Sequence, residues 1–241
     1  MIDIHNHIFP NIDDGSKSKE MSIEMLKNAY KQGITDVVNT VHYQHPMFQD
    51  IDLSFDSIYK VSQDLQNEIN QIGINIKIHI ASEVFYYDNL LKIKNNKLTT
   101  MGNGKYMLIE FHPNNIPVSQ KEVLYNLKIE GVTPIIAHPE RYRQVQKDIN
   151  YVYDWLNSGC LIQIDAGSLI GLLGENCMKT SRLIIQENLC QILASDAHNN
   201  AKRNFCLKDG HIYTKSILGD KADLLVYHYP KVIIEGGNIS L

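Results

Sequence analysis

The chain is poor in cysteine, with four among its 241 residues. Cys160, Cys177, Cys190 and Cys206 are too widely separated for a C-x-x-C zinc or redox site, so we expect buried, reduced thiols. A cysteine-dependent phosphatase needs a C-x5-R loop, and Cys177 with Arg182 is one residue too short. The other cysteines have no arginine at the required position either. Any phosphoester chemistry in this chain must therefore use a metal.

Long apolar runs and basic clusters are also missing. No stretch approaches the roughly 18 apolar residues of a membrane-spanning helix, and the chain does not begin with the basic and apolar regions of a signal peptide. The net charge of -4 argues against a general binder of nucleic acid or membrane surfaces. We therefore expect a soluble cytoplasmic protein that binds no nucleic acid and does not insert directly into a membrane.

Linkers, low-complexity segments and repeats of fixed period are absent as well. A length of 241 residues is typical of a single α/β barrel, and 44% hydrophobic residues suffice for a sizeable core. We expect one domain over residues 1–241.

What the sequence does contain is a series of strand-like apolar runs that end in residues able to bind metal. These are 1–4 with His5 and His7, 37–41 with His42, 76–82 with Glu83, 106–109 with Glu110, 132–137 with His138, and 190–194 with Asp196 and His198. One further run, 160–164, ends at Asp165. If these strands form a parallel barrel, their C-terminal ends gather at one face, where such barrels place their chemistry. The sequence therefore predicts a metal site at that face.

Helical patterns alternate with the strands. They cover residues 19–32, 54–72, 119–131 and about 145–158, 175–188 and 219–227. Ser18 is placed to cap the first helix and Gly33 to end it, and Ser119-Gln120-Lys121-Glu122 is a capping-box pattern. The alternation predicts the α/β class, with a βα unit repeated about seven times in a TIM-like barrel.

Several motifs together match a known family in order and spacing, over residues 1 to about 203. They are Met1-Ile2-Asp3-Ile4-His5-Asn6-His7, Ile12-Asp13-Asp14-Gly15, Leu108-Ile109-Glu110-Phe111, Ile136-Ala137-His138-Pro139-Glu140-Arg141 and Ser195-Asp196-Ala197-His198-Asn199. On these motifs the chain resembles the PHP (polymerase and histidinol phosphatase) superfamily. Within it, the chain is similar to the manganese-dependent protein-tyrosine phosphatases of bacterial capsule and exopolysaccharide operons.

The resemblance implies a distorted (β/α)7 barrel of the PHP type and assigns the site residues. The metal ligands it implies are His5, His7, Asp14, His42, Glu83, Glu110, His138, Asp196 and His198. It also implies that Arg141 and Arg203 hold the phosphate, although Lys202-Arg203-Asn204 lacks the family's proline and leaves Lys202 as a substitute. These ligands would hold about three ions, and the family implies Mn2+; imidazole and carboxylate ligands also suit iron or zinc.

The implied chemistry explains the residue types. Metal ions activate water at neutral pH, and arginine forks bind phosphate oxygens and stabilise the transition state. A tyrosine phenolate has a pKa near 10, so it leaves with less help from an acid than an alkoxide needs. If a general acid exists, His45 and His112 are the alternatives. Asp13 is interpreted as a turn residue beside the ligand Asp14.

The substrate class leaves three alternatives open. The first, implied by the family, is a phosphotyrosine protein, in particular a bacterial tyrosine autokinase that regulates polysaccharide export. The second is a small molecule such as histidinol phosphate, and the third is a metal-binding regulatory module without turnover. The third predicts lost ligands, and none is lost. A homo-oligomer is left open. Aromatic residues that could pack the substrate ring, with core packing as the alternative, are Phe48, Tyr86, Tyr87 and Tyr142.

Overall fold

The computed structural model describes residues 1–48 and 53–239, and its centre is a parallel barrel. The strands are β1 (Ile2–Asn6), β2 (Asp36–Tyr43), β3 (Lys77–Phe85), β4 (Tyr106–Glu110), β5 (Thr133–Ile136), β6 (Leu161–Asp165) and β7 (Ile192–Ala194). They form one seven-stranded sheet in the order β1-β2-β3-β4-β5-β6-β7, in which each strand pairs in parallel with the next. The predicted seven-unit TIM-like barrel is confirmed.

The barrel closes between the first and last strands through a few backbone contacts. Asn6 forms an isolated parallel bridge with Ala197. The His7 amide donates to the Ala197 carbonyl at 2.8 Å, and the Asp196 amide donates to the His5 carbonyl at 2.9 Å. Closure therefore lays the His5-Asn6-His7 segment directly beside the Asp196-Ala197-His198 segment.

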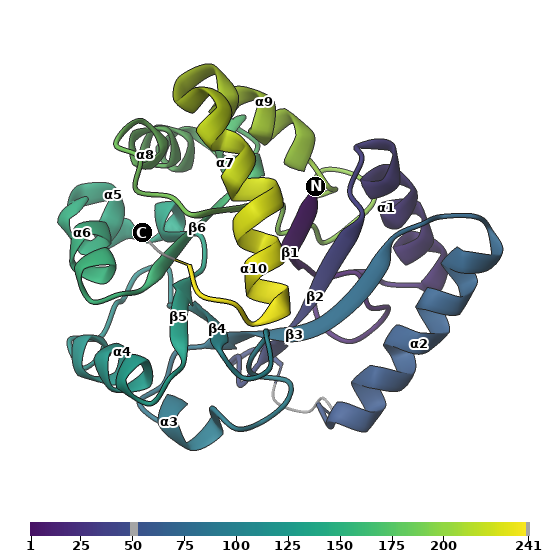
Figure 1. Ribbon diagram of the computed structural model, residues 1–241, viewed down its shortest axis with the longest axis horizontal. Coiled ribbons are helices and arrows are strands. Elements are labelled where there is room, and N and C mark those ends of the chain that lie inside the picture. The colour runs from purple at the N-terminus through teal and green to yellow at the C-terminus, as the bar shows by residue number, and fades with distance from the viewer. Residues whose placement is uncertain (49–52, 240–241) are drawn as a thin grey trace.

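Helices surround the strands, as Figure 1 shows. They are α1 (Lys19–Lys31), α2 (Phe55–Gln71), α3 (Leu90–Ile93), α4 (Gln120–Ile129), α5 (Arg143–Lys147), α6 (Asn150–Asn157), α7 (Ala166–Leu169), α8 (Glu175–Gln186), α9 (Leu207–Leu218) and α10 (Tyr229–Glu235). Short 3-10 turns cover Pro139–Arg141 and Gly219–Lys221, and Leu224–His228 is a π-helix. Among the described residues, no helix combines the length and apolar character needed to cross a membrane.

The predicted helix ends are correct for the first helix and wrong for the capping box. The Ser18 side chain accepts from the Met21 amide at 3.2 Å, and Gly33 follows the helix with φ +80°, a conformation that favours glycine. Ser119 itself has helical φ and ψ and forms no side-chain cap; its Oγ lies 3.4 Å from the Tyr86 hydroxyl. A tertiary contact therefore replaces the local cap.

Two helical predictions differ from the structure, and the helix α9 was not predicted at all. The helix expected over about 145–158 is divided into α5 and α6, and residues 219–227 form 3-10 and π turns before α10. The helix α9 was not predicted, because Gly210 interrupts its pattern. A Cβ at Gly210 would lie 2.6 Å from the Ala166 Cβ, so glycine is needed where α9 packs on α7.

Two apolar layers form the core of the barrel. The outer layer fills the space between strands and helices, whereas the inner layer fills the barrel with residues such as Ile4, Leu108 and Ile135. Ile233 of α10 joins the inner layer beside Ile2, near the N-terminal ends of the strands, and α10 crosses the barrel in Figure 1. The opposite end carries the polar residues of the site.

The wall of the barrel is incomplete between β3 and β4. β3 pairs with β2 along Lys77 to Val84, following the register Asp36 to Tyr43. It pairs with β4 only at Glu83, Val84 and Phe85. The N-terminal half of β3 therefore has β2 as its only strand neighbour among the described residues.

Candidate metal centre

The structure brings together every side chain predicted as a metal ligand. Four groups have ligand atoms within 4.8 Å of one another: His5, His7, Glu83 and Asp196; Glu83, Glu110 and His138; His7, Asp14, His42 and His198; and His42, His45 and Glu110. Except for Asp14 and His45, their members are buried. The fourth group adds His45, which the sequence suggested only as an acid.

The first group surrounds a single point with two imidazoles and two carboxylates. His5 Nε2 lies 3.1 Å from Glu83 Oε2 and 3.3 Å from Asp196 Oδ1. His7 Nε2 lies 3.3 Å from the same Glu83 oxygen and 3.4 Å from the same Asp196 oxygen. Such a set of facing nitrogen and oxygen atoms suits a transition-metal ion.

Glu83 links the first group to the second. Its Oε2 faces His5 and His7, whereas its Oε1 lies 2.7 Å from His138 Nε2. The third group is centred on Asp14, whose Oδ1 is 3.3 Å from both His42 Nε2 and His198 Nε2. His7 belongs to the first and third groups, so the three groups are contiguous.

Local backbone geometry aims some of these side chains into the cluster. His138 has φ +31° and Asp196 has φ +47°, in the left-handed region that costs of order 1–3 kcal/mol for a residue other than glycine. Gly15 lets the loop carrying Asp14 approach β1, since a Cβ there would lie 2.2 Å from the His7 carbonyl oxygen. The Asp-Asp-Gly sequence is thus required by packing as well as by turn geometry.

The electrostatics of the cluster indicate an excess of buried negative charge. Burial and the neighbouring Glu83 carboxylate raise the pKa of Glu110 well above its usual value. Burial acts to lower the pKa of His5, but the Glu83 and Asp196 carboxylates outweigh it and raise that pKa to about 9. A bound cation would relieve both effects, and its binding would displace the proton from His5.

Polar atoms without a hydrogen bond agree with a cation inside the cluster. Within the described part of the chain, His42 Nδ1, Glu110 Oε2 and Asp196 Oδ1 are buried and form no hydrogen bond, although other ligand atoms of the cluster face them. Buried polar groups are rarely left unsatisfied without a reason. The donors are imidazole and carboxylate with no thiolate, so the residues present fit manganese, iron or zinc.

Asp13 has a role that the sequence interpretation missed. Its Oδ2 lies 2.9 Å from His7 Nδ1 and accepts from the His42 amide at 3.2 Å, and its Oδ1 accepts from the Gly15 amide. Asp13 thereby fixes the ring of His7 so that Nε2 faces the cluster. Its place next to Asp14 in a turn motif concealed this contact, because the partner lies on another segment.

A second chain of contacts supports His5. His5 Nδ1 lies 2.9 Å from Gln163 Oε1, and Gln163 Nε2 donates to Asp165 Oδ1 at 3.1 Å. Asp165 Oδ2 in turn accepts from Arg141 Nη1 at 3.5 Å. The sequence carried one signal for this chain: Gln163 and Asp165 are two apart on an apolar strand and so share its inner face.

Both predicted arginines lie at the mouth of the cluster. Arg141 Nη1 donates to Asp196 Oδ2 at 2.7 Å, and Arg203 Nη2 donates to the same oxygen at 2.6 Å. They line a cleft of about 410 Å³ together with most of the candidate ligands. Lys202 does not line this cleft. Arg203, and not its alternative Lys202, therefore lies at the mouth of the cluster.

The aromatic residues that line this cleft differ in part from those expected from the sequence. Phe48 lines it, stacked on His42 at 5.2 Å between ring centroids, and so does Phe85, which was not predicted. Tyr142 is fully buried, and its hydroxyl donates to the Ala137 carbonyl at 2.6 Å. Tyr86 and Tyr87 line a neighbouring pocket instead of the cleft.

Comparison with known sequences agrees with this geometry. The family described as "Capsular polysaccharide synthesis, CpsB/CapC" matches residues 1–235. The chain belongs to the CpsB/CapC family. It is 37% identical over 211 residues to the putative tyrosine-protein phosphatase CapC of Staphylococcus aureus, a match that covers 86% of this chain and 81% of that protein. It is 32% identical to a tyrosine-protein phosphatase CpsB of Streptococcus agalactiae over 208 residues, 83% of each chain.

Solved structures place this CpsB/CapC member in the same fold. It superimposes with a TM-score of 0.92 on a structure described as YwqE from Bacillus subtilis and CpsB from Streptococcus pneumoniae, "unique metal-dependent tyrosine phosphatases". That match has 28% sequence identity and covers 100% of this chain and 96% of the other. An organophosphorus hydrolase mutant, 13% identical, shares the fold with a TM-score of 0.59 over 97% of this chain and 92% of that one.

We predict that Gln163→Ala lowers metal affinity by about 10- to 100-fold, because His5 loses the acceptor that orients its ring. Metal retained against a competing chelator measures this. Gln120→Ala is the matched control: Gln120 is a buried glutamine that accepts from Trp155 Nε1 at 2.9 Å and contacts none of the candidate ligands through a hydrogen bond. Equal metal affinity in Gln163→Ala and the unaltered protein would show that Gln163 does not support the site.

Proposed function

We propose that this member of the CpsB/CapC family hydrolyses phosphotyrosine in proteins with a cluster of about three divalent cations. The observation that carries the proposal is the bridging position of Glu83, whose two oxygens face separate imidazole groups beneath two arginines. The names of the relatives support the substrate class. Divalent cations bound there would supply an activated water and offset charge that develops on phosphorus.

The ligands we propose follow the geometric groups. They are His5, His7, Glu83 and Asp196 for one ion, Glu83, Glu110 and His138 for a second, and His7, Asp14, His42 and His198 for a third. His45 is an additional candidate, since its Nε2 lies 3.8 Å from Glu110 Oε2. Manganese is our proposal for the metal; it rests on the family resemblance, because the donor atoms suit iron and zinc equally.

Arg141 and Arg203 are proposed to bind the phosphate oxygens. Both side chains line the cleft and are partly exposed, with 28% and 30% of their surface accessible, so an anion can reach them. Planar forks match phosphate oxygens and stabilise the charge of the transition state. Their shared partner Asp196 holds them beside the metal cluster.

The tyrosine ring is proposed to lie against an aromatic wall. Phe48, His45 and Phe85 line one side of the cleft, with His45 against Phe48 at 5.1 Å and against Phe85 at 5.0 Å. Aromatic packing of this kind favours a phenyl ester over serine or threonine phosphate. The preference of this wall for phosphotyrosine is weaker against histidinol phosphate than against serine or threonine phosphate. The rates on phosphotyrosine and histidinol phosphate are therefore compared directly in the test below.

The physiological setting is also a proposal. We infer that residues 1–241 act as one phosphatase domain in the cytoplasm and that the substrate is a bacterial tyrosine autokinase that regulates capsular polysaccharide synthesis. The family description, which refers to capsular polysaccharide synthesis, supports the pathway. The kinase itself rests on the resemblance of the motifs.

We predict that metal-stripped protein releases phosphate from a phosphotyrosine peptide only after Mn2+ is added, because the cluster supplies no other nucleophile of comparable strength. Initial rates on a phosphotyrosine peptide, a phosphoserine peptide and histidinol phosphate measure the selectivity. A higher kcat/KM on histidinol phosphate than on the phosphotyrosine peptide would show that the protein is a small-molecule phosphatase. No turnover of any substrate with metal bound would support the regulatory module instead.

Arg141→Ala should keep its metal and lose phosphotyrosine turnover by roughly two orders of magnitude or more, as expected for loss of a transition-state contact. Steady-state kinetics together with metal analysis test this. Arg143→Ala is the matched control, since Arg143 is exposed two residues further along the chain and does not line the cleft. Turnover equal to that of the control would exclude Arg141 from the mechanism.

Phe48→Ala should lower kcat/KM on a phosphotyrosine peptide by about tenfold, because the ring loses a packing surface. Inhibition by orthophosphate, which has no ring, should be unchanged. Metal content must be measured in parallel, since Phe48 also stacks on His42. If both phosphotyrosine turnover and phosphate inhibition weaken together, Phe48 supports the cluster and does not select the ring.

A further inference from the structure

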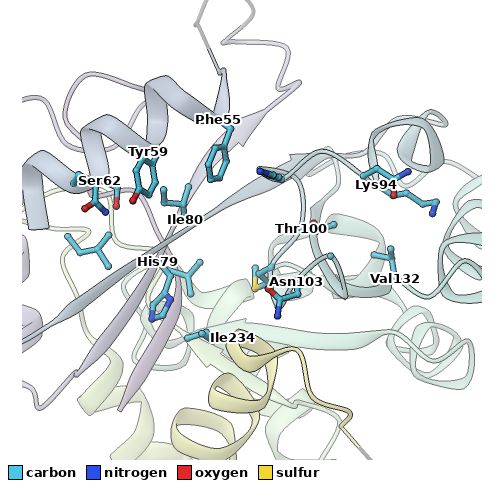
Figure 2. Close-up of a pocket in the computed structure, with 18 of the residues that line it drawn as sticks. Phe55, Tyr59, Ser62, His79, Ile80, Lys94, Thr100, Asn103, Val132 and Ile234 are labelled. Carbon is cyan, nitrogen blue, oxygen red and sulfur yellow. The ribbon is translucent and has the colours of Figure 1, made fainter.

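A cavity of about 750 Å³ lies along the N-terminal half of β3. Figure 2 shows that Phe55, Tyr59 and Ser62 reach it from α2, while His79 and Ile80 come from β3. The remaining wall includes residues 100–104, Val132 and Ile234. None of the described residues that line it also lines the cleft of the metal centre.

The cavity follows from the incomplete barrel wall. β3 pairs with β4 only from Glu83 onward. The side of β3 that β4 would otherwise cover therefore faces the cavity along Ile78 to Ile80. Val38 of the barrel interior and Tyr59 of the helical layer consequently line one cavity. Its volume lies in the range of roughly 300–1,000 Å³ that is typical of small-molecule sites.

The wall opposite β3 is held in place by specific contacts. Thr99 Oγ1 donates to the Ile93 carbonyl at 2.7 Å, and the Tyr106 hydroxyl donates to the Gly237 carbonyl at 2.8 Å. Gly102 packs so closely on α10 that a Cβ would lie 2.2 Å from the Ile233 carbonyl oxygen. The cavity is therefore preformed, which lowers the entropic cost of binding.

One side of the cavity is apolar and aromatic. The rings of Phe55 and Tyr59 are stacked, with centroids 5.8 Å apart and an interplanar angle of 16°. Ile80 of β3, labelled in Figure 2, lines the same cavity. A ligand with a planar or apolar body can lie against this surface.

The ion pairs of the charged residues that line the cavity involve two of its three described cations, Lys94 and His79. Lys94 pairs with Glu130 at 3.6 Å, and His79 lies 3.0 Å from Asp36. Lys97 forms no ion pair with any residue that the structure describes, and its Nζ lies 5.3 Å from the centroid of the Phe55 ring. An ammonium group beside an aromatic surface is suited to the head group of an amphipathic anion.

We propose that this cavity is a second ligand site, which binds a small organic anion with a ring or apolar body and a carboxylate, sulfonate or phosphate head. The head lies at Lys97, and the body lies along Tyr59 and Ile80. The site is separate from the phosphatase centre and does not depend on the function proposed for it.

The test is a fluorescence titration of the metal-loaded protein with 1-anilinonaphthalene-8-sulfonate, which has this chemistry. Saturating orthophosphate is present to occupy the arginine cleft. We expect one equivalent to bind. Lys97→Glu should weaken binding by at least about tenfold, through loss of attraction and added repulsion. Gln63→Trp should weaken it similarly, since Gln63 is an exposed lining residue of α2 and indole would fill the cavity.

Lys92→Glu is the matched control, because Lys92 is an exposed lysine of α3 that does not line the cavity. Its affinity for the probe should equal that of the unaltered protein. The circular dichroism spectrum and the thermal unfolding midpoint of Lys97→Glu should equal those of the unaltered protein, which confirms that the variant is folded. The proposal is overturned by absence of saturable binding, by equal weakening in Lys92→Glu, or by full affinity in both Lys97→Glu and Gln63→Trp.

Discussion

The concentration of buried carboxylates at one end of the barrel is the constraint on which the rest of the structure depends. Glu83 and Asp196 are almost fully buried within reach of the same two imidazoles, and Glu110 lies beside them. Isolated buried charges are very costly, so such a group persists only if cations surround it. The arginines at the mouth supply part of that charge. Bound metal ions would supply the rest and take the place of the proton on His5.

Much of the surrounding structure serves to hold this group in place. Asp3 is fully buried and accepts from the Ser195 amide at 3.0 Å and from the His5 amide at 3.2 Å, which joins β1 to the segment after β7. Burial raises the pKa of Asp3 to about 6, because desolvation disfavours the charged carboxylate. The hydrogen bonds of this junction therefore form at a cost in desolvation. Asp13 and Gln163 then orient individual imidazoles from outside the cluster. A rigid scaffold of this kind preorganises the site before substrate binds.

β3 runs from the candidate metal centre to the cavity at the other end of the strand. At its C-terminal end, Glu83 joins two groups of candidate ligands, and Phe85 lines the cleft. At its N-terminal end, the same strand has parted from β4 and borders the cavity. Because parallel strands twist, a strand that pairs at one end can diverge at the other. One departure from regular pairing therefore opens a cavity beside β3 while the candidate ligands at the other end of the strand stay together.

The sequence alone determined the strands, their parallel arrangement and the convergence of the candidate ligands. This was possible because apolar runs of strand length end in imidazoles and carboxylates, and because a parallel barrel places all those ends at one face. The roles of Asp13, Gln163, Asp165 and Phe85 were decided only by the tertiary structure. Gln163 contacts a residue 158 positions away, and no local pattern records such a pairing. The helix α9 and the cavity beside β3 were likewise hidden, since the first depends on close packing at Gly210 and the second on where two strands stop pairing.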